Sequence, residues 1–238
     1  MTRIFTLIGI LLTIMSPLRA ETGYADLSAK ASRYFQQQEW ASASAMYQLM
    51  IDRNPDVADV YAHAIVADGM RNDRLQQQQL LRQAIERHLP FDSIFGKVRE
   101  LSFSLGKATV YENFLMESRA TLPWATRNIN ARLLDYYMSR GNAPLAIDFA
   151  RKMLEGMPDN QTFLVALAKA YMMAGEFDKA KAELRNTLDI NPSSLPALLT
   201  LGNLLLSQGD RSEALPLLKR AYSLSPTPHL ASTIAGLE

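Results

Sequence analysis

The sequence contains no cysteine among its 238 residues. This absence excludes disulfides, zinc–thiolate sites, iron–sulfur clusters, thiol nucleophiles and the lipid-modified cysteine of a lipoprotein. An excess of charge of one sign is also absent, because 25 Lys and Arg residues stand against 24 Asp and Glu residues, for a net charge of +1. A nucleic-acid binder would carry a large basic excess, so no nucleic-acid partner is expected.

The residue patterns of common active sites are missing as well. No two of the 11 glycines are separated by a single residue, and neither a Gly-x-Ser-x-Gly nor a Gly-x4-Gly-Lys pattern occurs. These absences exclude the usual dinucleotide loop, nucleophile elbow and phosphate loop. His63, His88 and His229 include no pair at i, i+3 or i, i+4, so no helical metal clip is expected. We therefore expect no cofactor and no metal.

Residues 1–20 are predicted to be a secretory signal peptide. Arg3 gives a positive start, residues 4–15 form an uncharged and mostly apolar run, and residues 16–20 interrupt the helix and end in the small residue Ala20. The alternative is a retained membrane anchor, but a spanning helix needs about 20 apolar residues. We expect cleavage after Ala20, no membrane insertion afterwards, and a periplasmic rather than extracellular protein.

Prolines recur along the chain at intervals of 33 to 35 residues. They are Pro55, Pro90, Pro123, Pro158, Pro192 and Pro226. Because proline interrupts helices, this interval indicates a repeated helical unit of about 34 residues. A further proline, Pro216, is predicted to lie inside a helix, just beyond its first turn.

Small residues recur inside the units as well. Gly141, Gly175 and Gly209 follow one another at intervals of 34 residues, where the first helix of each unit ends. Glycine adopts the left-handed backbone that such a position favours. Asp210 and Glu213 are predicted to cap the helix that follows. The glutamine runs at 36–38 and 76–79 are interpreted as helix surface.

This pattern of small residues, large residues and prolines resembles the tetratricopeptide-repeat family. The likeness is clear over residues 24–57, 127–160, 161–194 and 195–228. Residues 58–126 keep the proline interval but depart from the family pattern, so we interpret them as two degenerate repeats; a non-repeat helical insert is the alternative. The resemblance implies an all-α, right-handed superhelical solenoid of antiparallel helix pairs. About six repeats would end in a short capping helix at 229–238, with Leu230, Ile234 and Leu237 on its apolar face.

The resemblance also implies a concave groove, formed mainly by the first helix of each pair. The groove candidates are Arg132, Asp135, Met138, Val165, Lys169, Met172, Met173, Leu199, Asn203 and Leu206. The further groove positions hold Asn128, Ala131, Ser139, Thr162, Ala166, Pro196, Thr200 and Ser207. Methionine provides adaptable apolar surface, and Arg, Lys and Asn can hydrogen-bond a peptide. The alternative is that the methionines are buried and the charges pair with each other, for example Asp135 with Lys169.

The family's chaperone-binding members hold a terminal carboxylate with basic and amide residues. This sequence has Ser28, Ser32, Val165 and Leu199 at those positions, so recognition of a chaperone tail is not expected.

The predicted function is an exported, non-catalytic scaffold or adaptor that binds a protein or peptide in the groove. One alternative is an enzyme that acts on envelope glycans, with Asp92, Glu100 and Glu112 as carboxylates in the degenerate middle. A second alternative is a scaffold that self-assembles through its C-terminal edge.

Overall fold

The computed structural model describes the backbone of residues 16–238 and the side chains from residue 23 onward. These residues form thirteen α-helices and one short 3-10 helix, with no strand among them. The all-α prediction is confirmed. Most of the predicted signal peptide, residues 1–15, lies outside the described residues. Residues 16–20, expected to interrupt a helix, instead begin α2 (Ser16–Gln36). A proline such as Pro17 is tolerated there because the first helical turn does not use its backbone N–H groups.

The chain divides into two compact units, residues 1–123 and 124–238, here called unit 1 and unit 2. The described part of unit 1 contains α2, α3 (Trp40–Arg53), α4 (Ala58–Met70), α5 (Arg74–Glu86), α6 (Phe91–Ser104) and α7 (Ala108–Thr121). The 3-10 helix Pro123–Ala125 follows. Unit 2 contains α8 (Thr126–Ser139), α9 (Ala143–Glu155), α10 (Gln161–Met173), α11 (Phe177–Ile190), α12 (Leu195–Ser207), α13 (Arg211–Leu224) and α14 (Pro228–Ala235).

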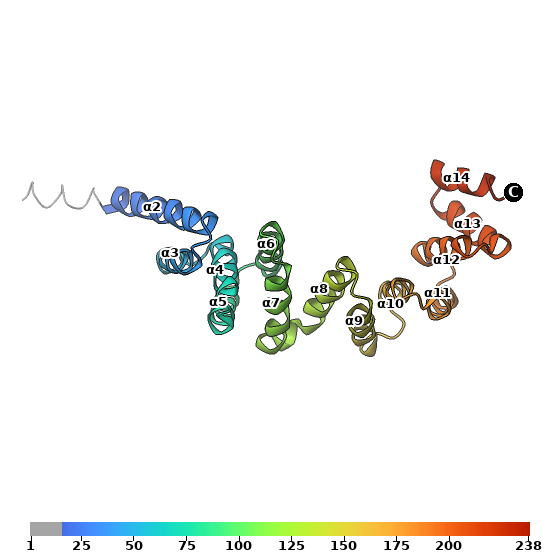
Figure 1. The fold of residues 1–238 in the computed structure, drawn as a ribbon, viewed down its shortest axis with the longest axis horizontal. Coiled ribbons are helices and arrows are strands. Elements are labelled where there is room, and N and C mark those ends of the chain that lie inside the picture. Colours follow the sequence, from blue (N-terminus) through green and yellow to red (C-terminus); the bar gives the residue numbers. More distant parts are fainter. Residues whose placement is uncertain (1–15) are drawn as a thin grey trace, which may run out of the picture. The chain divides into compact units, whose positions relative to one another are not determined.

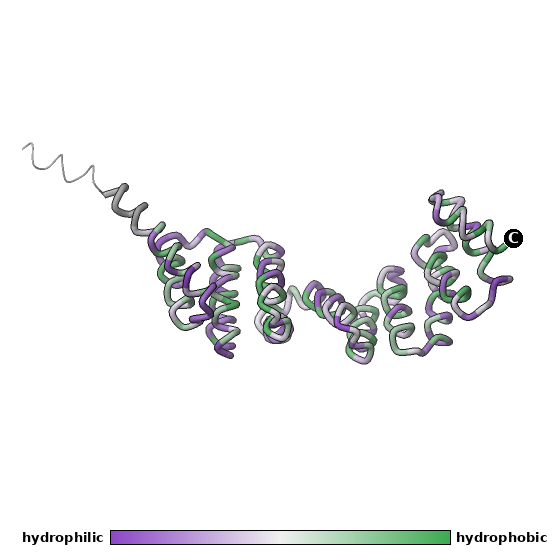
Figure 2. The backbone as a smooth tube through the Cα atoms, turned by 45° about the horizontal axis from the view of Figure 1, so that its top comes forward, coloured by the Kyte–Doolittle hydropathy of each residue, from purple (hydrophilic) through white to green (hydrophobic). Residues whose placement is uncertain are grey.

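The helices form pairs, and three residues separate the two helices of each pair (Figure 1). So short a turn makes the two helices antiparallel neighbours. Within each unit, every pair also packs against the next, for example α4 against α6 and α10 against α12. Hydrophobic residues alternate with hydrophilic ones along the helices (Figure 2), because each helix buries one stripe against its neighbours.

The turn inside each pair contains one residue with a positive φ. In unit 2 these residues are Gly141, Gly175 and Gly209, with φ of 69°, 76° and 87°. The predicted left-handed glycines are therefore confirmed. In unit 1 the same position holds Gln38, Asn72 and Gly106, with φ of 60°, 60° and 67°. The turn thus recurs throughout the described helix pairs, although glycine does not.

The interior of each unit lies between the helices of its pairs. In unit 1, the rings of Phe95 and Phe114 lie 4.8 Å apart and both are fully buried. In unit 2, α12 approaches α13 closely at Gly202, where an added Cβ would lie 2.7 Å from Cδ2 of Leu218. At the end of unit 2, Leu230 and Ile234 of α14 pack on the cluster that contains Leu218.

Two sequence interpretations are wrong in the structure, the first of them for the glutamine run 76–79 but not for the exposed run 36–38. Gln77 and Gln78 are only 1% and 8% exposed, because α5 packs against both α4 and α7. The Gln77 amide donates to the carbonyl oxygen of Ile65 at 2.7 Å. The predicted capping pair is also absent. Asp210 precedes α13 but its side chain makes no capping hydrogen bond, and Glu213 instead accepts one from Arg185.

Candidate binding groove

All ten groove candidates lie on α8, α10 and α12, the first helices of the pairs in unit 2. Asp135, Lys169 and Asn203, which occupy one position in successive repeats, are all exposed. Val165 is 5% exposed. The partly buried candidates are Arg132, Met138, Met172, Met173, Leu199 and Leu206.

A pocket of about 550 Å³ brings three of these candidates together. Met138 comes from α8, and Val165 and Lys169 come from α10. The other residues around this pocket are Gln161, Thr162, Ala166, Asn191, Ser193, Ser194, Leu195 and Pro196. The lining of this pocket therefore combines apolar side chains with hydroxyl and amide groups.

A second pocket, of about 200 Å³, lies between α12 and α14. Leu199 and Asn203 line it from α12, and His229 and Thr233 line it from α14. Leu195 of α12 lines both pockets. The larger pocket lies between α10 and α12 and the smaller one between α12 and α14, so the two lie on either side of α12.

The structure adds lining residues that the sequence analysis missed. His229 and Thr233 belong to α14, outside the repeats, whereas the sequence interpretation considered repeat positions only. The loop residues Asn191, Ser193 and Ser194 belong to the repeat 161–194 but follow its second helix, and the groove candidates were taken from first helices only. Conversely, neither pocket is lined by Arg132, Asp135, Met172, Met173 or Leu206.

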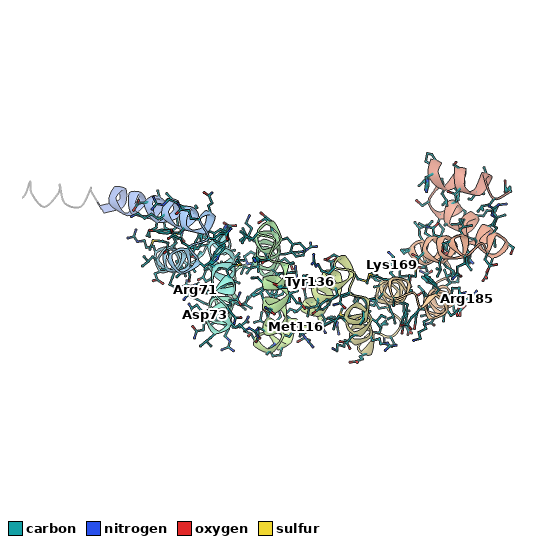
Figure 3. The ribbon with its side chains drawn as sticks, in the orientation of Figure 1. Arg71, Asp73, Met116, Tyr136, Lys169 and Arg185 are labelled. Atoms are coloured by element: carbon teal, nitrogen blue, oxygen red, sulfur yellow. The ribbon has the colours of Figure 1, made fainter. Side chains whose placement is uncertain are left out.

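Lys169 is the charged residue of the larger pocket. Its side chain is exposed and forms no ion pair within residues 23–238, so the pair between Asp135 and Lys169 that was the alternative to a groove is not formed. In Figure 3, Lys169 belongs to α10, whereas the labelled Arg185 belongs to α11, the second helix of the same pair. An ammonium group with no acidic neighbour in its pocket favours a ligand that carries negative charge or carbonyl oxygens.

The first helices of unit 1 carry charges that pair with each other. Nδ1 of His63 lies 2.8 Å from the carbonyl oxygen of Asp59 and 3.3 Å from its Oδ2. Nζ of Lys97 lies 3.9 Å from Oδ1 of Asp59 and 2.8 Å from Oε1 of Glu100. The hydrogen bond with Glu100 raises the pKa of Lys97. His63 also packs on the ring of Phe35, with centroids 5.2 Å apart.

Two of the carboxylates suggested for catalysis, Asp92 and Glu100, do not lie close together on α6. Asp92 and Glu100 lie on that helix eight residues apart, which places them about 12 Å apart along its axis. Glu112 lies on α7. Within the described part of the chain, no group of three or more His, Asp or Glu residues is placed to hold a metal ion.

No helix between residues 16 and 238 combines the length and the apolar character needed to cross a membrane.

Comparison with protein-family models identifies the C-terminal repeats. Two models, each described as a tetratricopeptide repeat, match residues 137–205 and 195–228. Residues 137–228 therefore match the tetratricopeptide-repeat pattern. The helix pairs before them have the same turn and interval, and their assignment as individual repeats of this family stays a prediction.

Three known proteins are similar to parts or most of this chain. A segment of 79 residues is 32% identical to the BBSome complex member BBS4 from Bos taurus, covering 33% of this chain and 15% of that relative's length. A chain of the APC/C hetero-tetramer Cut9–Hcn1 is similar with a TM-score of 0.50 and 15% identity, covering 98% of this chain and 45% of that one. The C-terminal part of a TPR repeat-containing protein from Cytophaga hutchinsonii has a TM-score of 0.48 and 15% identity, covering 82% of this chain and 77% of that one.

Proposed function

We propose that this chain is an exported, non-catalytic scaffold that binds a protein or a peptide along α8, α10 and α12. The observation that carries the proposal is the pair of pockets on either side of α12, which place Lys169 and Asn203 beside apolar side chains. Concave sites with an apolar base and a few polar groups are typical of binding sites. Export to a bacterial periplasm is part of this proposal and depends on the predicted signal peptide.

The two polar residues have distinct roles in this proposal. Lys169 attracts a carboxylate or a carbonyl oxygen, and the Asn203 amide offers both a donor and an acceptor to a peptide backbone. Met138, Val165 and Leu199 supply apolar contact beside them. The methionine side chain adapts to different partners, which suits a scaffold.

The proposal is tested by affinity capture from envelope extract of the source cell, with captured proteins identified by mass spectrometry. The chain without residues 1–20 is compared with its Lys169→Glu/Asn203→Ala variant. We expect the wild type to retain a protein that the variant loses by about tenfold or more, because the variant reverses the charge in one pocket and removes an amide from the other.

A matched control carries the same two kinds of substitution in unit 1. Lys107→Glu/Asn113→Ala changes an exposed lysine before α7 and an exposed asparagine on it. The control should retain the captured protein, and all three chains should have equal helix content by circular dichroism. Equal capture by wild type and groove variant, or no capture by any chain, contradicts the groove.

Neither alternative function gains support from the contacts. Leu230 and Ile234 are 7% and 9% exposed, so α14 uses its apolar face within its own chain and has little left for a second copy. For a glycan-acting enzyme, Glu100 already pairs with Lys97. We therefore keep binding as the proposed function.

A further inference from the structure

The larger groove pocket lies at the N-terminus of α12. Ser194, the residue before this helix, lines the pocket together with Leu195 and Pro196, the first two residues of the helix. The backbone N–H of Leu195 has no hydrogen-bond partner within the part of the chain that the structure describes, as is usual for the first N–H groups of a helix. The positive end of the α12 dipole is therefore next to this pocket, and it favours a negatively charged group there.

Ser194 brings a buried hydroxyl group without a partner into the pocket lining. The residue is only 5% exposed, and its side chain makes no hydrogen bond within residues 23–238. Its backbone groups are both bonded, the N–H to the carbonyl oxygen of Asn191 at 3.1 Å and the carbonyl oxygen to the N–H of Leu198 at 2.9 Å. The hydroxyl is therefore the polar group that Ser194 offers to the pocket. Because buried polar groups are nearly always hydrogen-bonded, this one points to a ligand oxygen.

Hydrogen bonds in the loop before α12 orient a second donor. The N–H of Ser193 donates to Oδ1 of Asn191 at 3.0 Å. Nδ2 of Asn191 is therefore the donor in its 2.9 Å contact with Oε1 of Gln161. This contact occupies the Gln161 oxygen, and the Gln161 NH2 group makes no hydrogen bond to any described residue. Gln161 lines the pocket and so offers it a donor.

The charge in the larger pocket is positive. Lys169 is its one charged lining residue, and no acidic residue lines it. A recess of about 410 Å³ between α11 and α13 differs in this respect, because Asp189 and Glu213 stand beside two arginines in its lining. Pro216, which lies inside α13 as predicted, is also part of that lining. An anion therefore finds an unbalanced positive charge in the groove pocket and a balanced set of charges in the recess.

We propose that the larger pocket binds the carboxylate of an acidic side chain in the partner protein or peptide. This inference rests on the proposed function, and it names the chemical group that the groove recognises. The carboxylate accepts hydrogen bonds from the Lys169 ammonium, the Ser194 hydroxyl and the Gln161 NH2 group. Hydrogen bonds to an ionised acceptor are stronger than those between neutral groups.

The number of charges and the course of the groove favour this group over other anions. A phosphoryl group carries about two negative charges and is typically bound by a cluster of arginines, whereas this pocket contains a single lysine. The smaller pocket lies on the other side of α12 in the same proposed groove. A peptide that occupies both pockets continues past the larger one, so its carboxylate belongs to a side chain and not to the chain end.

Nuclear magnetic resonance titrations of the purified chain with short peptides test the proposal. The probes are acetyl-Leu-Glu-amide and its uncharged counterpart acetyl-Leu-Gln-amide, in which leucine suits the apolar side chains of Met138 and Val165. We expect the glutamate peptide to shift the backbone amide signals of Ser194 and Leu195. It should bind about tenfold more tightly than the glutamine peptide, because its acceptor is charged.

Two further probes distinguish the other sources of negative charge. Acetyl-Leu-phosphoserine-amide carries a phosphoryl group, and acetyl-Gln-Leu with a free C-terminus carries a terminal carboxylate. Both should bind more weakly than the glutamate peptide. Tighter binding of either one overturns the assignment of the pocket to an acidic side chain.

Two variants test the residues that hold the carboxylate. Ser194→Ala removes a hydroxyl that bonds to no described residue, so the fold should persist while the glutamate peptide binds about fivefold more weakly. Lys169→Met should weaken this binding about tenfold and remove most of the preference for glutamate over glutamine. Ser207→Ala is the control at the other end of α12, where the hydroxyl donates to the carbonyl oxygen of Leu204. It should bind like the wild type.

Failure of this inference is distinguishable from failure of the proposed function. Glutamate and glutamine peptides that act alike, including no signal change with either, overturn the carboxylate site, and so does wild-type affinity in Ser194→Ala. A protein captured by the wild type and lost by the groove variant would still support the groove in that case. Selective binding of the glutamate peptide together with failed capture would support the carboxylate site and contradict the scaffold.

Discussion

Units 1 and 2 form the same turn with different residues. The position of positive φ holds glycine in all three turns of unit 2, but Gln38 and Asn72 in the first two turns of unit 1. An L-residue in this conformation costs roughly 1–2 kcal/mol relative to the right-handed one. The packing of two antiparallel helices therefore imposes the turn, and glycine only lowers its cost.

The interiors of the two units also differ, because unit 1 buries more polar side chains where its helices meet. Unit 2 places Gly202 of α12 against Leu218, an apolar contact that the repeat pattern predicts. Unit 1 places Gly69 of α4 near the amide of Gln77, and it also buries Gln78 and Asp68. Both solutions bring paired helices into close contact. Family models match only the sequence of unit 2, which has the apolar contact.

The exposed charges on the first helices also differ. In unit 1, Lys97 pairs with both Asp59 and Glu100. In unit 2, Lys169 stands in a pocket without an acidic partner. This difference is the reason why the proposed binding site lies in unit 2. The following substitutions test how far the two units differ in stability.

The largest expected effect concerns Gln78, whose two amide atoms are both buried without a hydrogen-bond partner. Gln78→Met keeps the size of the side chain and removes the unsatisfied amide, so it should raise the free energy of unfolding by about 1–2 kcal/mol. Urea unfolding followed by circular dichroism measures the change.

Gln77→Met is the matched control for that variant. It removes the hydrogen bond to Ile65 and should lower stability by about 1 kcal/mol. If both substitutions destabilise the protein equally, the Gln78 amide is hydrogen-bonded in solution and does not lower the stability of unit 1.

Asp68 makes the stability of unit 1 depend on pH. The equivalent positions in the repeats of unit 2 hold no acidic residue. Burial raises the pKa of the Asp68 carboxyl, while hydrogen bonds from Ser44 and Arg71 act in the opposite direction. A raised pKa in the folded state means that folding favours the protonated acid. The contribution of Asp68 to stability is therefore present below the unfolded-state pKa of about 4 and is lost as the pH rises through the folded-state value.

Asp68→Asn removes this titration and keeps an acceptor for the Ser44 hydroxyl. We expect the variant to gain about 1 kcal/mol over the wild type at pH 7. The gain should shrink as the pH falls toward 4. Urea unfolding at several pH values from 4 to 7 measures it, and a gain that grows toward acid pH would show that Asp68 is stabilised as a carboxylate.

The smallest effect comes from exchanging the turn residues. Gln38→Gly should stabilise the protein by about 0.5 kcal/mol, because relief of the left-handed backbone exceeds the entropy that glycine adds to the unfolded chain. Gly175→Gln should destabilise it by a similar amount. Asn72→Gly should change little, since asparagine tolerates this conformation. Thermal unfolding measures the order of stability of the three variants. A loss of stability in Gln38→Gly would contradict the expected order.

Particular residues show why some predictions held and others failed. Gly175 was predictable because its backbone requirement is local. The burial of Gln78 was not, because it depends on α5 lying against both α4 and α7. Met138 and Lys169 share a pocket, but Met172 lies outside it, since repeat positions fix a face of the helix and not the gap between neighbouring helices. The residues of α14 lie outside the repeat pattern altogether.

The sequence by itself determined the all-α class, the 34-residue interval, the left-handed glycines and the position of Pro216 inside its helix. These features depend on local backbone preferences and on hydrophobic periodicity, which the residues carry wherever the helices lie. Tertiary structure alone decided that Asp59 pairs with Lys97, that Lys169 forms no ion pair with the side chains of residues 23–238, and that a recess opens between α11 and α13. Such features arise from side chains far apart in the chain, and their distances exist only once the helices have packed.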